Sequence, residues 1–242
     1  MKNSYKLAGY GFTLAEVLIT LGIIGIVAAL TLPSLLSNFR DKVMVSQAKK
    51  SYSNFQNVLN KMMADEGYTD YAGIFNTDET QLQKVQKFAR YYNSAKVCSS
   101  VNQGCGKVYP VKLATPTNNG SGGLSKEYFD FPRIVTTDGS AIYFRNIRQN
   151  CEPFTYQADI KDSNGFSTGE KQTITDTRCT TVIFDVNGEN KGPNQYGADI
   201  HQVLILPKKL SVIEGAQGAL NSILLQDKLK YQKYPDDMRF DK

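Results

Sequence analysis

A run of twenty residues without a charged side chain, residues 17–36, constrains the fold of this chain more than any other feature. An apolar helix of about 20 residues is long enough to span the hydrocarbon core of a bilayer. A short basic segment precedes the run and carries Lys2 and Lys6, which the positive-inside bias places on the cytoplasmic side. We therefore expect a membrane-spanning helix near the start of the chain.

A carboxylate, Glu16, stands immediately before this apolar run. An unpaired charge at the edge of the hydrocarbon costs roughly several kcal/mol, and ionisable residues there usually have a function. An ordinary secretory signal peptide has a shorter apolar region, of about 7–15 residues, followed by small residues at its cleavage site. Here Ala28 and Ala29 lie inside the run. A plain single-span anchor gives Glu16 no role, so we expect this carboxylate to have a function beyond membrane anchoring.

Residues 11–16 read Gly-Phe-Thr-Leu-Ala-Glu and resemble the N-terminus of type IV prepilins, a family that includes the pseudopilins of type II secretion. The resemblance implies that a dedicated peptidase cleaves after Gly11 and methylates the new amine of Phe12. Glu16 then becomes the fifth mature residue, as in the family. Pro33 falls at the twenty-second mature position, where the family commonly has a proline.

What the resemblance implies is a structural subunit rather than an enzyme. The precursor would cross the bacterial inner membrane once, with its head on the exported side, and then join a periplasmic or extracellular filament. Its partners would be the prepilin peptidase and methylase, the inner membrane, and other pilin or pseudopilin subunits in a homo- or hetero-filament. Glu16 would pair with the Phe12 amine of a neighbouring subunit and set the register. Type IV pilins and pseudopilins share this motif.

A second function from a different class stays open. The chain would then be an exported binding or enzymatic domain that uses the N-terminal segment only as a signal peptide or a single-span anchor. Cleavage after Ala29, rather than after Gly11, would favour this alternative.

The resemblance implies a leader, residues 1–11, followed by a membrane or filament-core helix, residues 12–36. Periodicity and length then indicate an amphipathic continuation and a globular α/β head, residues 37–66 and 67–242. In the continuation, apolar residues from Phe39 to Met62 recur mostly every three or four positions, which indicates one face of a helix. We expect one long helix over residues 12–65, ended by Gly67. The fold class is α+β, with this helix packed on an antiparallel sheet, and the resemblance implies a pilin-like arrangement.

Three residues weaken the predicted helix: Gly22, Gly25 and Pro33. Relative to alanine, glycine costs about 1 kcal/mol in a helix interior and proline about 3 kcal/mol. Pro33 also removes the hydrogen bond to the Ala29 carbonyl. Bending or partial melting of this stretch in a filament is one expectation, and the ordinary frequency of glycine and proline in membrane helices is the other.

Strand signals dominate the second half of the chain. The Asp138-Gly139 turn predicts a hairpin between residues 133–136 and 141–145. Two more β-rich runs follow, residues 180–186 and 202–206.

Helix and loop signals surround these strands. Residues 77–93 are predicted to form a helix with Asp78 and Gln81 as its capping box. Residues 211–231 also have helical composition, with one apolar side. Residues 107–132 are predicted to be irregular, residues 160–170 a polar loop, and the charged tail from residue 235 loose.

Four cysteines follow the membrane segment: Cys98, Cys105, Cys151 and Cys179. An even number on the exported side of a membrane indicates disulfides, and four cysteines allow three pairings. Closeness in sequence favours Cys98 with Cys105 and Cys151 with Cys179. Free buried thiols are the alternative to disulfides. A zinc site is disfavoured, because the chain has no Cys-x-x-Cys and His201 is its single histidine.

One loop carries oxygen side chains at alternating positions around a glycine: Asp185, Asn187 and Glu189, with Asp199 further on. Carboxylate and amide oxygens suit calcium, although the spacing is not that of an EF-hand. Asn-Gly and Gly-Pro dipeptides also form turns without any ion. Some pseudopilins hold calcium in a loop near the end of their sheet, which the resemblance makes relevant. We expect a turn, with calcium as the alternative and no other cofactor.

Charge and motif content argue against two further classes. The net charge of +5 falls to +3 when Lys2 and Lys6 leave with the leader, and no basic stripe with interleaved aromatic residues is present, so we expect no nucleic-acid partner. No nucleophile elbow or Cys–His pattern accompanies His201, so we expect no catalytic site.

Overall fold

The computed structural model describes most of the chain: residues 11–92, 96–99, 110–115, 126–129, 132–148, 151–161, 167–212 and 220–234. The chain forms two compact units, Met1–Lys42 and Val43–Lys242. We call the second the head unit. The predicted tail from residue 235 lies outside the described residues.

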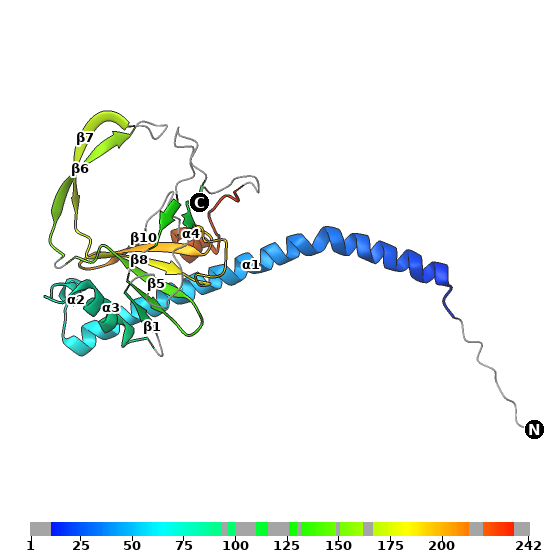
Figure 1. The fold of residues 1–242 in the computed structure, drawn as a ribbon, viewed down its shortest axis with the longest axis horizontal. Coiled ribbons are helices and arrows are strands. Elements are labelled where there is room, and N and C mark those ends of the chain that lie inside the picture. Colours follow the sequence, from blue (N-terminus) through cyan, green and yellow to red (C-terminus); the bar gives the residue numbers. More distant parts are fainter. Residues whose placement is uncertain are drawn as a thin grey trace, which may run out of the picture. The chain divides into compact units, whose positions relative to one another are not determined.

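A single helix, α1, covers Leu14–Glu66 (Figure 1) and confirms the predicted long N-terminal helix. Its first half is long and apolar enough to cross a membrane, and the apolar side chains there are exposed, as Leu30 is at 75%. Gly67 follows the helix with φ of 72°, the left-handed conformation in which glycine ends helices without steric cost.

Within the head unit, α1 buries one face against a sheet. Its buried residues recur at helical spacing: Met44, Val45, Ala48, Phe55, Val58, Leu59 and Met62. The ring centroid of Phe55 lies 5.5 Å from that of Phe184 and 5.9 Å from that of Phe88. These side chains belong to one continuous apolar core, which the periodicity of the sequence predicted in outline.

The sheet has six strands in the order β1-β4-β5-β8-β9-β10, and its neighbours all pair antiparallel, as predicted. The strands are β1 (Lys96–Cys98), β4 (Arg133–Val135), β5 (Ala141–Arg145), β8 (Thr180–Asp185), β9 (Ile200–Ile205) and β10 (Leu210–Val212). Strands β4 and β5 flank the predicted Asp138-Gly139 turn. The fold class is therefore α+β, with a long apolar N-terminal helix and an antiparallel sheet.

Both faces of the sheet are covered. Successive residues of a strand point to opposite sides of the sheet, so one strand contributes side chains to two cores. In β5, Ile142 and Phe144 join the core under α1, whereas Ala141 and Tyr143 join a second, smaller core. A two-stranded sheet of β2 (Pro110–Lys112) and β3 (Lys126–Tyr128) contributes to that side through Val111. The prediction of an irregular stretch over residues 107–132 was therefore wrong where these strands pair.

The second predicted helix is shorter than expected and begins later. After a single turn, α2 (Ala72–Phe75), helix α3 covers Gln81–Ala89. Its capping box is formed by Thr80 and Gln83, not by Asp78 and Gln81. The Thr80 hydroxyl accepts from the Gln83 N–H while the Gln83 side chain accepts from the Thr80 N–H, so this pair satisfies two donors at once.

A polar ribbon replaces part of the predicted loop over residues 160–170. Strands β6 (Phe154–Lys161) and β7 (Ser167–Asp176) form a separate two-stranded antiparallel sheet (Figure 1). Most residues of β7 are exposed, so the ribbon has no apolar alternation that would reveal a strand. Residues 162–166 lie outside the described part of the chain.

The C-terminal prediction was also partly wrong. Residues 210–212 form strand β10, which pairs with β9, and helix α4 covers Leu220–Gln226, whereas residues 213–219 lie outside the described part of the chain. Residues 228–234 continue without helix or strand, and the N–H of Gln232 donates to the Ala114 carbonyl at 2.7 Å. Tertiary hydrogen bonds thus override the helical composition of this stretch.

Candidate functional site

The start of α1 is held by a capping box that the sequence interpretation missed. The Thr13 hydroxyl accepts from the Glu16 N–H at 3.2 Å, and Glu16 Oε2 accepts from the Thr13 N–H and hydroxyl, both at 2.8 Å. The pattern Thr-x-x-Glu before an apolar run is a recognisable signal for this cap. Glu16 therefore has a structural role within its own chain, besides any role toward a partner.

The residue before the predicted cleavage point is not required by the surrounding structure. A Cβ atom added at Gly11 would meet no atom of the described chain within 4 Å, and Gly11 does not have positive φ. Phe12, which follows it, is 88% exposed. Gly22 and Gly25 in α1 are equally uncrowded, and Pro33 lies inside the helix as predicted.

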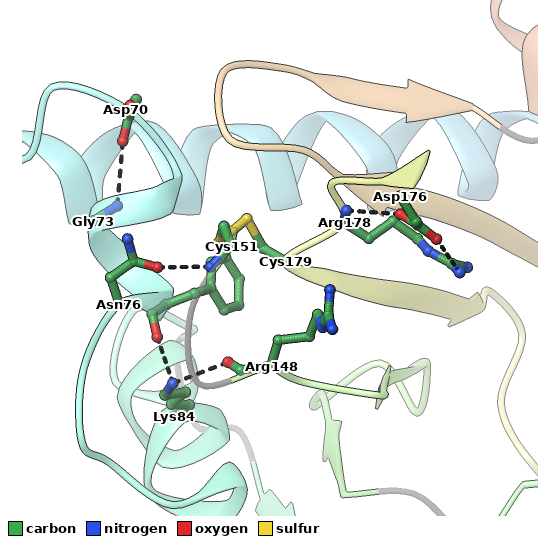
Figure 2. The surroundings of a disulfide bond; sticks show 10 residues. Asp70, Gly73, Asn76, Lys84, Arg148, Cys151, Asp176, Arg178 and Cys179 are labelled. Carbon is green, nitrogen blue, oxygen red and sulfur yellow. Dashed lines mark hydrogen bonds and ion pairs between the residues drawn. A yellow bond between two sulfur atoms is a disulfide. The ribbon is translucent and has the colours of Figure 1, made fainter. Parts of the chain in front are cut away.

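A disulfide joins Cys151 to Cys179, as predicted, with an S–S distance of 2.08 Å (Figure 2). Cys151 lies shortly before β6, and Cys179 lies between β7 and β8, so the bridge closes the β6–β7 ribbon at its base. Cys98 is disulfide-bonded and buried, but its predicted partner, Cys105, lies outside the described residues.

Buried polar contacts tie this bridge to the helices (Figure 2). The Cys151 N–H donates to the Asn76 side-chain oxygen at 2.8 Å. The buried Lys84 Nζ donates to the carbonyls of Phe75 at 2.5 Å and Arg148 at 3.2 Å. Burial lowers the pKa of Lys84, although Glu79 and Asp78 oppose the shift. The ammonium group thus links the segment after β5 to α2 and α3.

Two aspartates, Asp185 and Asp199, accept hydrogen bonds from the backbone of the predicted turn or calcium loop. Asp185 is buried and its Oδ1 accepts from the Gly188 N–H at 2.8 Å. The two oxygens of Asp199, also buried, accept from the N–H groups of Asn194 and Gln195, each at 2.8 Å. Burial raises the pKa of Asp199, while these donors act in the opposite direction. The carboxylates thus serve as acceptors for turns of the backbone.

The other two predicted calcium ligands are placed differently. Asn187 donates from Nδ2 to the Gly192 carbonyl at 3.1 Å, and its Oδ1 is buried without a donor in the described residues, as is Oδ1 of Asn194. Glu189 instead forms an ion pair with Arg133 Nε and accepts from the Tyr143 hydroxyl at 2.7 Å. This geometry favours the turn. Calcium binding stays a prediction.

The Arg133–Glu189 pair is nearly inaccessible to water: the side chains are 1% and 9% exposed. The guanidinium carbon of Arg133 also lies 5.5 Å from the centroid of the Tyr143 ring. The pair connects β4 to the loop after β8, far apart in sequence. No local pattern marks such a pair, so the sequence interpretation could not find it.

The same loop contacts the β4–β5 turn at two glycines. Gly188 has φ of 95°, and a Cβ atom at this position would collide with the Gly139 carbonyl oxygen. Only glycine therefore fits here.

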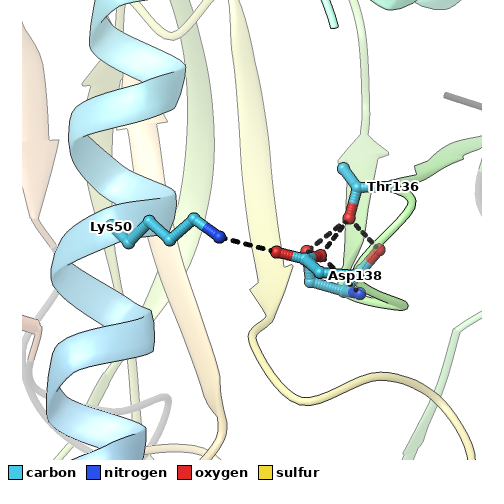
Figure 3. A network of polar contacts seen from close by, with 4 residues as sticks. Lys50, Thr136 and Asp138 are labelled. Carbon is cyan, nitrogen blue, oxygen red and sulfur yellow. Dashed lines mark hydrogen bonds and ion pairs between the residues drawn. The ribbon is translucent and has the colours of Figure 1, made fainter. Parts of the chain in front are cut away.

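Beside that turn lies a cavity of about 390 Å³, lined by residues of α1, the β4–β5 turn and the segment that follows α3. Lys50 Nζ reaches from α1 to Asp138 Oδ2 at 2.9 Å (Figure 3). The hydroxyls of Thr136 and Ser140 donate to Asp138 Oδ1 at 2.6 and 2.8 Å. These hydrogen bonds hold the pKa of Asp138 well below its usual range, and its oxygens are already engaged.

His201 lies on β9 and is fully buried, and burial lowers its pKa to about 4. In the described residues, no group of three or more His, Cys, Asp or Glu side chains could hold a metal ion. No protein-family model matches the chain, and no curated protein or solved structure matches it either.

Proposed function

We propose that this chain is a non-enzymatic filament subunit of the type IV prepilin kind, for a type IV pilus or a type II secretion pseudopilus. A peptidase cleaves after Gly11, and the amine of Phe12 is then methylated. The apolar half of α1 holds the precursor in the inner membrane and afterwards packs with the helices of other subunits. The head unit stays on the exported side.

The observation that carries the proposal is the segment from Gly11 to Glu16 at the start of an apolar helix. The fold of the chain does not demand glycine at position 11, since an added Cβ atom meets nothing there. A peptidase that grips extended backbone closely would demand it. Phe12 is exposed and precedes the helix by two residues, so the scissile bond is not enclosed by the described chain.

Glu16 is able to serve both the cap and a partner. Its Oε2 atom accepts both hydrogen bonds from Thr13, and Oε1 accepts none within the described residues. The side chain is exposed in the isolated subunit. The Phe12 amine of a second subunit would form an ion pair with this oxygen in apolar surroundings, where such a pair is much stronger than in water.

Exposure of the apolar side chains of α1 gives independent support. Phe12, Leu30, Leu36 and Phe39 are all more than 60% exposed. Surface of this kind is stable only against lipid or against other protein, so it marks an interaction site. Gly22 and Gly25 add places where another helix backbone can approach closely.

The alternative is an exported binding or enzymatic domain that uses this segment only as a signal or an anchor. The Thr13–Glu16 cap is compatible with that alternative, since it would stabilise any helix that begins here. What separates the two functions is therefore processing at Gly11, not the presence of Glu16.

The test is mass spectrometry of the chain expressed in a bacterium that has a prepilin peptidase. We expect a mature protein that has lost residues 1–11 and carries one methyl group on Phe12. Gly11→Leu should accumulate at full length, because the side chain blocks the peptidase. Gly22→Leu is the matched control, since Gly22 is equally uncrowded, and it should be cleaved normally. Normal cleavage of Gly11→Leu, or cleavage after Ala29, would refute the proposal.

A further inference from the structure

A second cavity, of about 440 Å³, lies at the base of the β6–β7 ribbon. Arg148, Arg178, Phe154, Tyr156 and Thr181 line it. Phe154 pairs with Asp176 in the first register position of the ribbon, and the Cys151–Cys179 bridge closes the same end. The volume falls within the range of about 300–1,000 Å³ that is common for small-ligand sites.

Arg148 brings a positive charge that no described carboxylate neutralises. Its guanidinium carbon lies 3.4 Å from the centroid of the Phe154 ring, and its Nη1 atom is buried without a hydrogen-bond acceptor in the described residues. In Figure 2 its side chain extends away from Lys84. Stacking on a ring occupies the face of a guanidinium group, while its N–H donors lie in the plane and suit a carboxylate.

Arg178, by contrast, is already balanced. Its Nη2 atom forms an ion pair with Asp176 Oδ2, and its backbone N–H donates to Asp176 Oδ1 at 2.8 Å. The three charged groups at the cavity therefore sum to one positive charge. A monoanion would neutralise this charge, whereas a phosphate group, with about −1.5 to −2, would exceed it.

Besides Asn146, Thr180 and Thr181, the remaining wall of the cavity consists of two aromatic side chains. The rings of Phe154 and Tyr156 are stacked with their centroids 5.8 Å apart and an interplanar angle of 24°. Tyr156 is 40% exposed, so part of this apolar surface is open to a ligand. We propose that the cavity binds a carboxylate carried on an aromatic or apolar stem, with Arg148 as the partner of the carboxylate and Tyr156 beside the stem. This site does not depend on filament formation.

A simpler role for Arg148 is to anchor the ribbon by stacking on Phe154, with no ligand. The experiment must separate this role from binding. We choose benzoate as the probe, because it combines one negative charge with a ring. Benzyl alcohol keeps the ring without the charge, acetate keeps the charge without the ring, and inorganic phosphate carries the higher charge.

The measurement is calorimetric titration of the full-length chain in detergent micelles, with empty micelles as the blank. Benzoate should bind saturably, and benzyl alcohol, acetate and phosphate should each bind at least about tenfold more weakly, which corresponds to about 1.4 kcal/mol. Arg148→Gln should lower the affinity for benzoate by a similar factor. Arg90→Gln, which removes an equal charge from an exposed position outside the cavity, should not.

A second variant covers the case in which Arg148→Gln loosens the ribbon. Tyr156→Ala changes a partly exposed side chain. It should lower the affinity for benzoate severalfold and leave the affinity for acetate unchanged. Absence of saturable benzoate binding would overturn the proposal. Equal affinity of benzoate and benzyl alcohol, or of benzoate and phosphate, would overturn it as well, because the carboxylate would then not be what the cavity recognises.

Discussion

Removal of the Glu189 side chain gives the sharpest test of the buried network between β4 and the loop after β8. Glu189→Ala removes the carboxylate that forms the ion pair with Nε of Arg133, a side chain that is 1% exposed. It also removes the acceptor of the Tyr143 hydroxyl. Breaking a buried pair by removing one partner costs about 3–5 kcal/mol. Because Glu189 is 9% exposed and water can partly replace it, we expect the lower end, about 3 kcal/mol.

The assay is thermal unfolding of the full-length chain in detergent, followed by the circular dichroism of the sheet. For a unit of this size, 1 kcal/mol shifts Tm by about 2–4 °C, so Glu189→Ala should lower Tm by about 6–12 °C. Glu170→Ala, on the exposed strand β7, is the control and should have little effect. Replacing both partners, Arg133→Met with Glu189→Leu, should recover much of the loss. A Tm for Glu189→Ala within about 2 °C of the control would refute the reasoning.

The same samples test calcium. With Glu189 paired to Arg133 and the Asp199 oxygens occupied by N–H donors, too few oxygens remain for the six to eight that calcium takes. We expect neither added calcium nor chelator to change Tm. A bound ion at a hundredfold excess over its dissociation constant would instead stabilise the head by about 2.7 kcal/mol. An increase of that size would establish the metal site and reject the ion-free turn.

Three further changes have defined outcomes. Glu16→Gln keeps an acceptor for the Thr13 cap but loses the charge, whereas Glu16→Leu loses both. If the chain is a filament subunit, electron microscopy should show few filaments from either variant. Normal filaments from Glu16→Gln would mean that the charge of Glu16 is not needed for assembly. The double change Cys151→Ser with Cys179→Ser opens a loop with a sequence separation of 28, so chain entropy predicts a loss of about 3.5 kcal/mol, measurable as a lower urea midpoint; an unchanged midpoint would contradict this. Burial lowers the pKa of His201 to about 4 from about 6.5 in the unfolded chain, so between these pH values the unfolded state alone binds the proton, and stability falls as pH falls, by up to about 3 kcal/mol. The raised pKa of Asp199 changes stability with pH in the opposite direction. The measurement is therefore the difference in the pH dependence of stability between wild type and His201→Leu. Parallel curves of stability against pH would show that His201 does not cause the loss.

The parts of the fold that the sequence predicted are those with strong local or periodic signals. The apolar run, the recurrence from Phe39 to Met62 and the Asp138-Gly139 turn each depend on neighbouring residues, and the structure has the long helix and the β4–β5 hairpin there. The Cys151–Cys179 bridge was also predictable, because the two residues are near in sequence. The Thr13–Glu16 cap has a local pattern as well and could have been found.

The parts that were not predictable depend on contacts between distant segments. Glu189 looked like a calcium ligand from its neighbours, but its partner Arg133 comes from another strand. The β6–β7 ribbon is polar on most positions, so composition suggested a loop although its backbone hydrogen bonds make a sheet. The cavity at Arg148 forms only when the ribbon and the end of β5 come together, and no spacing of residues encodes that meeting.

The glycine contact between residues 139 and 188 also couples two segments of the head unit that are distant in sequence. The Gly139 carbonyl fills the space beside Gly188, so the β4–β5 turn cannot move inward without pushing the loop after β8. In the same turn, Asp138 is held by Lys50 of α1. An inward movement of the turn would therefore involve the loop after β8 directly, and α1 as well through the solvent-exposed Lys50–Asp138 ion pair.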